Sequence, residues 1–232
     1  MSRTPDSWQS DALTKMVTWG DNVLLCVSRQ AGKTETVAVA AYLEACLGSF
    51  VLVISASDRQ AMEFFQRMIE HHRRLNLVAE RKEPTQHELR LRSGGRVVAL
   101  PNNEKTLRGY ASVDMLVIDE AARVPDALYG AVCPMLAVSG GRIALLSTPF
   151  GRRGFFFKEW KGEGADDWQR FTHPWTKCPR LTPEFIERER RKHGDAFVDQ
   201  EFNCCFSSVD SSFFDVEAFE GLVDPELETI TW

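Results

Sequence analysis

Four short apolar runs constrain the fold of this chain more than any other feature. They read NVLLCV (22–27), FVLVIS (50–55), DMLVIDEAA (114–122) and RIALLST (142–148). Their length and lack of polar alternation are typical of strands that are buried on both faces. Segments of helical length lie between them, including residues 32–47 and 57–75. Strands that alternate with helices indicate βαβ units, so we predict an α/β fold with a mostly parallel sheet covered on both faces.

Three other segments carry local structural signals. The helix expected at 57–75 begins at Asp58 as N-cap, and its periodicity places on one face Met62, Phe65, Met68 and Ile69. HELRLR and RVVAL flank Ser93-Gly94-Gly95, which predicts a hairpin. Residues 182–194 form an amphipathic pattern with Pro183 in a first-turn position, and residues 195–206 predict a further helix and strand.

Length and charge limit the possible organisation. The chain has 232 residues and a net charge of −5, enough for one sizeable core and a small additional subdomain. We expect the core at 1–175, a subdomain at 176–206 and a linker-like tail at 207–232. No apolar run reaches the roughly 18 residues of a membrane helix, so no membrane partner is expected. A nucleic-acid surface would have to be local, and the candidates are 71–74, 152–153 and 188–192.

The segment CVSRQAGKTET (26–36) follows the first apolar run and opens a helix. A strand, a short loop and a helix start direct backbone N–H groups and the positive helix end at one point, which suits phosphate. Lys33 would reach the β- and γ-phosphates of a nucleotide, and the Thr34 hydroxyl would bind Mg²⁺. Val27 stands where such loops usually have their first glycine, so an ordinary helix start remains open for this segment alone.

Two acids end the third apolar run. Buried carboxylates need partners, so Asp119 is a candidate Mg²⁺ ligand and Glu120 a candidate for polarising an attacking water. The alternative is a strand that simply emerges into solvent. The fourth run ends in Ser147 and Thr148, whose hydroxyls could sense a γ-phosphate, although Ser, Thr and Pro also form ordinary turns. Gln9 is a candidate for reading adenine, because a glutamine amide can pair with N6 and N7.

Several of these segments together resemble one family, the ATPase domain of the large terminase subunit, which packages DNA into the heads of tailed bacteriophages. The resemblance covers about residues 5–206 and rests on SRQAGKT, LRGYASVDMLVIDEAA, LLSTPFGRRG and the later HPWTKCPRLTPEFI and DQEF. In that family the phosphate loop typically has the sequence Ser-Arg-Gln-x-Gly-Lys-Ser/Thr, without the first glycine. The resemblance therefore implies a P-loop NTPase of the ASCE/RecA-like type, with three layers and a small helical lid at 176–206.

The resemblance also implies a role for each matching residue. The nucleotide would be held by Gln9 at adenine and by the phosphate loop Ser28, Arg29, Gln30, Ala31, Gly32, Lys33 and Thr34. Asp119 would associate with Mg²⁺ and Glu120 would be the catalytic carboxylate. Ser147 and Thr148 match the coupling motif. An arginine finger can contribute about 10³–10⁵ in rate, and two candidates remain: Arg108, acting in trans on a neighbour's ATP, and Arg29, acting in cis.

Full-length members of the family carry a C-terminal nuclease domain with metal-binding acids. Asp210 and Asp215 have no partner set after them, so we expect no nuclease site in this chain, which would be a truncated form or act with a nuclease on another polypeptide. The implied partners are double-stranded DNA, the phage portal, the small terminase subunit and copies of the chain in a ring, within the cytoplasm of the infected host. The isolated domain would be a monomer.

Two other functions share parts of this pattern. A superfamily-two helicase or translocase has the same Gly-Lys-Thr and Asp-Glu pair, but usually a second RecA-like domain as well. An assembly module that binds nucleotide without hydrolysing it would make Glu120 dispensable. Unwinding of a forked duplex distinguishes the first alternative, and binding without turnover distinguishes the second.

Overall fold

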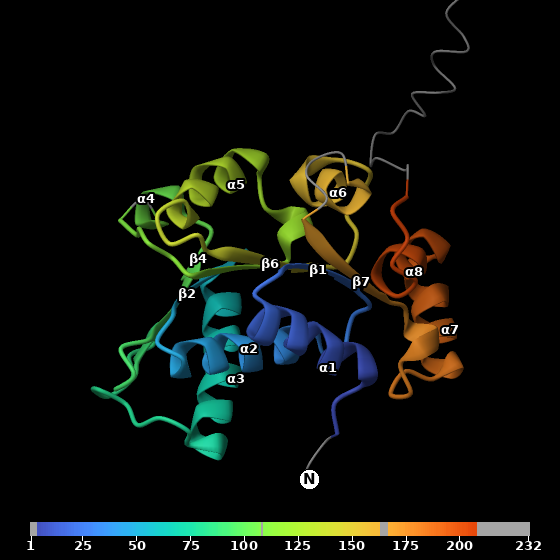
Figure 1. Cartoon of the computed structure of the whole chain (residues 1–232). Coiled ribbons are helices and arrows are strands. Elements are labelled where there is room, and N and C mark those ends of the chain that lie inside the picture. The colour runs from blue at the N-terminus through green and yellow to red at the C-terminus, as the bar shows by residue number, and fades with distance from the viewer. Residues whose placement is uncertain (1–3, 108, 163–166, 208–232) are drawn as a thin grey trace, which may run out of the picture.

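A seven-stranded sheet forms the middle layer of the molecule (Figure 1). The computed structural model describes residues 4–107, 109–162 and 167–207. The strands in chain order are β1 Asn22–Val27, β2 Phe50–Ser55, β3 Glu88–Arg90, β4 Arg96–Pro101, β5 Met115–Asp119, β6 Arg142–Ser147 and β7 Trp168–His173. Their order across the sheet is β3-β4-β2-β5-β6-β1-β7. The predicted α/β class and the four predicted buried strands are confirmed.

All neighbouring strands run parallel except β3 and β4. These two form an antiparallel pair around the predicted turn at Ser93-Gly94-Gly95, with Arg90 opposite Arg96. β6 lies between β1 and β5. The carboxyl ends of these three strands therefore meet at one edge of the sheet, where open α/β sheets bind their ligands.

Helices cover both faces of the sheet (Figure 1). One face carries α1, α2 and α3, the other carries α4, α5 and α6, and α7 and α8 lie beside β7. The α-helices are α1 Ser7–Leu13, α2 Lys33–Cys46, α3 Asp58–Leu75, α4 Glu104–Leu107, α5 Asp126–Val132, α6 Gly154–Lys161, α7 Pro183–His193 and α8 Asp195–Glu201. The other helical segments are the π-helical η1 Thr14–Trp19 and the 3-10 segments η2 Ala121–Arg123, η3 Cys133–Leu136 and η4 Trp175–Lys177.

The helix starts follow local capping chemistry. The prediction that Asp58 is the N-cap of α3 is wrong. The N-cap is Ser57, which has an extended backbone and whose Oγ accepts a hydrogen bond from Gln60 N–H at 3.3 Å. Asp58 instead lies in the first turn, where its charge favours the helix. Pro183 is in the first turn of α7 behind the N-cap Thr182, as predicted.

Two hydrophobic clusters hold the layers together, one on each face of the sheet. Alternation along β2 directs Val51 and Val53 toward α2 and α3, and Leu52 and Ile54 toward the opposite face. β7 was not predicted, because its sequence WQRFTH contains polar and charged residues. β7 is an edge strand and is only partly buried, so its side chains need not be apolar. The segment 195–201 is the predicted helix, but the described residues after it contain no strand.

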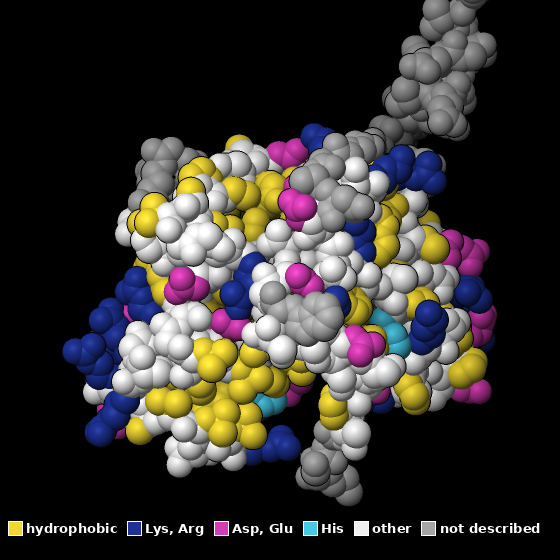
Figure 2. Space-filling view, in the orientation of Figure 1, with side chains coloured by type: hydrophobic (Ala, Val, Ile, Leu, Met, Phe, Trp, Pro, Cys, Tyr) yellow, Lys and Arg dark blue, Asp and Glu magenta, His cyan; other side chains and the backbone are white. Residues whose placement is uncertain are grey.

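The surface in the view of Figure 2 mixes acidic and basic side chains, and apolar side chains gather over the region of α2 and α3. Leu47, Leu75 and Leu77 are among the exposed large apolar residues. Within the described part of the chain, no helix combines the length and apolar character needed to cross a membrane. Arg108, Asp210, Asp215 and most of the tail predicted at 207–232 lie outside the described residues.

Candidate active site

The loop from Ser28 to Gly32 joins the end of β1 to the start of α2. Gly32 has φ +96°, a left-handed conformation that side chains rarely adopt, and a Cβ there would lie 2.8 Å from Gln9 Nε2. Gln30 also has positive φ, at 58°. The first N–H groups of α2 have no intrahelical acceptor, so this loop and helix start present donors at the carboxyl edge of the sheet. The predicted phosphate loop thus has the local structure that its chemistry requires.

Glu120 follows β5 with φ 53° and ψ 41°, again a left-handed conformation. Such strain in a residue other than glycine costs about 1–3 kcal/mol and often marks a functional site. The turn brings the Glu120 carboxylate over the phosphate loop, where Oε1 lies 3.6 Å from Lys33 Nζ. β1 and β5 are not neighbours in the sheet, so this contact is a product of the fold.

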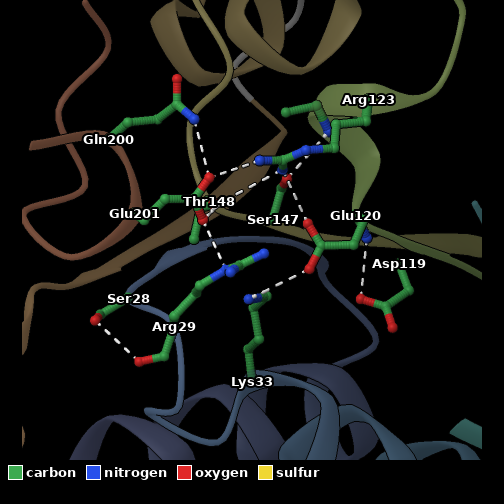
Figure 3. Close-up of polar contacts among 11 residues, drawn as sticks. Ser28, Arg29, Lys33, Asp119, Glu120, Arg123, Ser147, Thr148, Gln200 and Glu201 are labelled. Atoms are coloured by element: carbon green, nitrogen blue, oxygen red, sulfur yellow. Dashed lines mark hydrogen bonds and ion pairs between the residues drawn. The ribbon is translucent and has the colours of Figure 1, made fainter. Parts of the chain in front are cut away.

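Five charges of alternating sign form a chain across the site (Figure 3). Lys33 pairs with Glu120 Oε1 at 3.6 Å, and Glu120 Oε2 accepts from Arg123 Nη1 at 3.0 Å. Arg123 Nη2 donates to Glu201 Oε1 at 2.7 Å, and Glu201 Oε2 lies 2.9 Å from Arg29 Nε. Each of the three cations therefore has a carboxylate partner, although the three share only two carboxylates, Glu120 and Glu201.

The hydroxyl of Thr148, the residue after β6, joins this network. Thr148 Oγ1 donates to Glu201 Oε2 at 3.0 Å and accepts from Arg123 Nη1 at 3.4 Å. Ser147 Oγ accepts from Ala122 N–H at 3.3 Å. Both residues are buried. The predicted coupling pair thus contacts the segment that follows Glu120, as well as α8.

Glu201, the last residue of α8, receives most of these contacts. Burial opposes its ionisation, but the hydrogen bond from Gln200 and the charges of Arg123 and Arg29 outweigh it, so the pKa of Glu201 lies below its usual value. Its backbone also takes part, since Arg29 N–H donates to Glu201 O at 2.9 Å. Neither Glu201 nor Arg123 had a predicted role. Glu201 lies in the DQEF segment, but an acid and a base this far apart in the chain give no local signal that they meet.

Gln9 lies beside the loop, as its prediction requires, but its amide is already hydrogen-bonded. Oε1 accepts from Asp6 N–H at 2.9 Å, and Nε2 donates to Thr36 Oγ1 at 2.9 Å and to Gly32 O at 3.4 Å. Arg180 lies on the same side, bound to Asp6 at 2.7 Å and to Ala31 O at 3.0 Å. The adenine-reading role of Gln9 stays a prediction, and reading a base would require these bonds to be exchanged.

Oxygen donors suited to Mg²⁺ gather at the edge of this site. Asp119 is buried, and its Oδ1 accepts a hydrogen bond from Glu120 N–H at 3.0 Å. β2 and β5 pair through Ile54 and Ile118, so the next residues, Ser55 and Asp119, follow side by side on the α2 face. Ser55 is fully buried and its Oγ has no hydrogen-bond partner in the described chain. Thr34 lies in the first turn of α2, and the oxygen chemistry of these three residues fits a hydrated Mg²⁺.

The pKa of the Asp119 carboxyl is raised to about 7, first by burial and then by the negative charge of Glu120. The unfolded chain titrates near the ordinary 3.8, so the folded state holds this proton more tightly. The unfolding free energy therefore falls as pH rises from about 4 to about 7. We expect Asp119→Asn to raise Tm by about 3 °C or more at pH 8 and by much less at pH 4.5, where the folded carboxyl is still protonated.

Thermal unfolding without nucleotide or divalent cation checks this expectation. Asp11→Asn, a change at an exposed position in α1, is the matched control and should leave Tm unchanged at both pH values. An equal gain for Asp119→Asn at both pH values would show that the charged carboxylate is not the destabilising species.

Comparison with known proteins places this chain in a family. The sequence model for "Terminase large subunit, T4likevirus-type, N-terminal" matches residues 24–220, which is most of the chain. The chain belongs to this family. No curated protein sequence matches it. The large-terminase match includes the phosphate loop, the Asp119-Glu120 pair, Ser147-Thr148 and Glu201.

Solved structures of large terminases share the fold. The ATPase domain from Thermus phage P74-26 has a TM-score of 0.74 at 22% identity, covering 88% of this chain and 94% of that one. The large terminase of the thermophilic bacteriophage D6E has a TM-score of 0.74 at 13% identity, and that of bacteriophage HK97 has 0.69 at 16%. This chain covers 54% and 50% of those two proteins. The RecA-like terminase ATPase fold predicted from sequence is thus confirmed.

Proposed function

We propose that this terminase domain hydrolyses ATP and that hydrolysis drives double-stranded DNA into a phage procapsid. The observation that carries the proposal is the approach of Glu120 to Lys33 at 3.6 Å above a phosphate-type loop. In phosphoryl transfer, the lysine that binds the γ-phosphate and the carboxylate that orients the attacking water must both reach the same phosphate group. The D6E large terminase, which has the same fold, has been solved with ADP and with ATP-γ-S.

In this mechanism the loop amides and Lys33 bind the β- and γ-phosphates, and Lys33 leaves Glu120 to do so. The freed Glu120 carboxylate orients a water for attack on the γ-phosphorus, in line with the leaving oxygen. The carboxylate takes up a proton from that water. Mg²⁺, held with the nucleotide by Thr34 and Asp119, would supply charge neutralisation of the phosphates. Ser147 and Thr148, at the end of β6, report the loss of the γ-phosphate to neighbouring elements.

An arginine completes the charge stabilisation. Arg29 lies on the phosphate loop, where it pairs with Glu201, and a bound polyphosphate would draw it toward the phosphates. Arg108 matches, by the family resemblance, an arginine that acts in trans on a neighbour's nucleotide. We propose Arg108 in a ring of copies as the finger, with Arg29 acting in cis as the alternative. The helical segment 176–206 acts as the lid. The motor binds the portal and the small terminase subunit, and it works in the cytoplasm of the infected host.

A mixing experiment tests this assignment. Arg108→Ala protein keeps an intact site but lacks the finger, and Glu120→Gln protein keeps the finger but has an inactive site. We expect each alone to be inactive and the mixture to recover turnover, with wild-type specific activity rising with protein concentration. The opposite assignment, Arg29 as the finger in cis, has two signs. The mixture stays inactive, and wild-type specific activity does not depend on protein concentration and is abolished only by Arg29→Ala.

Family membership favours packaging over the helicase alternative. A forked duplex separates the two, because a packaging motor translocates on duplex DNA and leaves its strands paired. Nucleotide binding without turnover, in wild type and Glu120→Gln alike, would instead support the assembly-module alternative.

A further inference from the structure

We propose that Arg123 is a positioning residue that holds the Glu120 and Glu201 carboxylates in place when the loop cations turn to the phosphates of a bound nucleotide. This inference rests on the proposed function and adds a residue to it. Arg123 ends the short η2 segment, three residues after Glu120. The five-charge chain has Arg123 at its centre (Figure 3).

The guanidinium of Arg123 contacts three separate segments. Nη1 donates to Glu120 Oε2 at 3.0 Å and to Thr148 Oγ1 at 3.4 Å, and Nη2 donates to Glu201 Oε1 at 2.7 Å. Its Cζ also lies 4.9 Å from the centre of the Phe150 ring, on the loop that follows β6. One planar group therefore ties the end of β5, the end of β6 and α8 together.

The two acids differ in how many cations they would keep once nucleotide binds. Glu120 pairs with Lys33 and Arg123, and Glu201 pairs with Arg29 and Arg123. Lys33 and Arg29 both lie on the phosphate loop, where a polyphosphate attracts them. Arg123 lies beyond that loop and is the shared partner that remains for both acids.

Burial makes that remaining partner important. The Glu201 side chain is 3% exposed and that of Glu120 is 20% exposed. A carboxylate that loses all its cations in such a place is strongly disfavoured, and it would move toward water or take up a proton. By retaining both acids, Arg123 keeps Glu120 directed at the reacting water and keeps α8 attached to the site.

The geometry of the contacts requires an arginine. A lysine supplies one ammonium with three donors at a single nitrogen, whereas guanidinium spreads its donors over a rigid plane. The contacts to Glu120 and Glu201 use different terminal nitrogens of that plane. Arg123→Lys therefore retains the charge but loses the simultaneous contact with both carboxylates.

The test compares Arg123→Gln and Arg123→Lys with wild type in ATP turnover and in binding of a non-hydrolysable ATP analogue. We expect kcat to fall about 10- to 10²-fold in Arg123→Gln, because the water-orienting carboxylate is misplaced, and to be partly restored in Arg123→Lys. Analogue Kd should change less than about 3-fold, because Arg123 does not bind phosphate. Arg59→Gln, which removes an exposed arginine paired with Glu63, is the matched control and should keep wild-type kcat.

Hydrogen exchange of the α8 amides gives a readout independent of turnover. On analogue binding, exchange in 195–201 should rise in Arg123→Gln but not in wild type, since Glu201 then lacks a cation. An unchanged kcat, an unchanged α8 exchange, or a rise in Kd as large as the fall in kcat would overturn the inference. If Arg123→Gln does not fold, as judged by Tm, then kcat, Kd and α8 exchange are compared between Arg123→Lys and wild type instead. Absence of turnover in wild type refutes the proposed function instead, and the exchange measurement still tests Arg123.

Discussion

Replacing Glu120 with glutamine is expected to lower ATP turnover by about 10²- to 10⁴-fold, the range for loss of a general base, while ATP still binds. Glutamine has the same shape and retains an oxygen for Arg123, so the site stays assembled. It cannot accept a proton from water, and it no longer pairs with Lys33 as an ion. Because Lys33 is then free for phosphate, nucleotide affinity should be equal to or higher than that of wild type.

Phosphate release and fluorescent-nucleotide binding measure the two effects separately. Glu63→Gln, on the exposed face of α3, is the matched control and should match wild type in both. Wild-type turnover in Glu120→Gln would exclude Glu120 as the catalytic carboxylate. Loss of both binding and turnover would instead indicate that Glu120 holds the site together.

Replacing Lys33 with alanine is expected to weaken ATP binding from about 30-fold to more than 10³-fold, equivalent to the roughly 2–5 kcal/mol lost when one partner of a buried charge pair is removed. Lys33 is 7% exposed and is the first residue of α2, directly after the left-handed Gly32. Its ion-pair partner in the structure is Glu120, and a bound phosphate would replace that partner.

The folded state without nucleotide should tolerate this change, since Glu120 keeps its contact with Arg123. We therefore expect Tm to change little while Kd rises, as measured by thermal unfolding and equilibrium binding. Lys192→Ala, on the exposed side of α7, is the control and should leave Kd unchanged. Unchanged affinity in Lys33→Ala would place the nucleotide elsewhere on the molecule.

Long periodic segments were readable from sequence because each reflects local burial. The apolar run at 50–55 is buried throughout, and helix 57–75 exposes and buries residues with the expected period. Ser57 and Asp58 are both good N-caps, and only the backbone at the start of α3 distinguishes them. β7 lacked a signal because its polar residues suit an edge strand.

The strand, loop and helix start at Gly32-Lys33-Thr34 and the acids Asp119 and Glu120 could be predicted from sequence, because they depend on residues adjacent in the chain. Which distant groups contact them depends on the tertiary structure. β6 enters between β1 and β5, and α8 returns beside β7 to bring Glu201 to Arg29 and Arg123. Contacts between residues 29, 123 and 201 depend on strand order and helix packing, which local propensity does not encode.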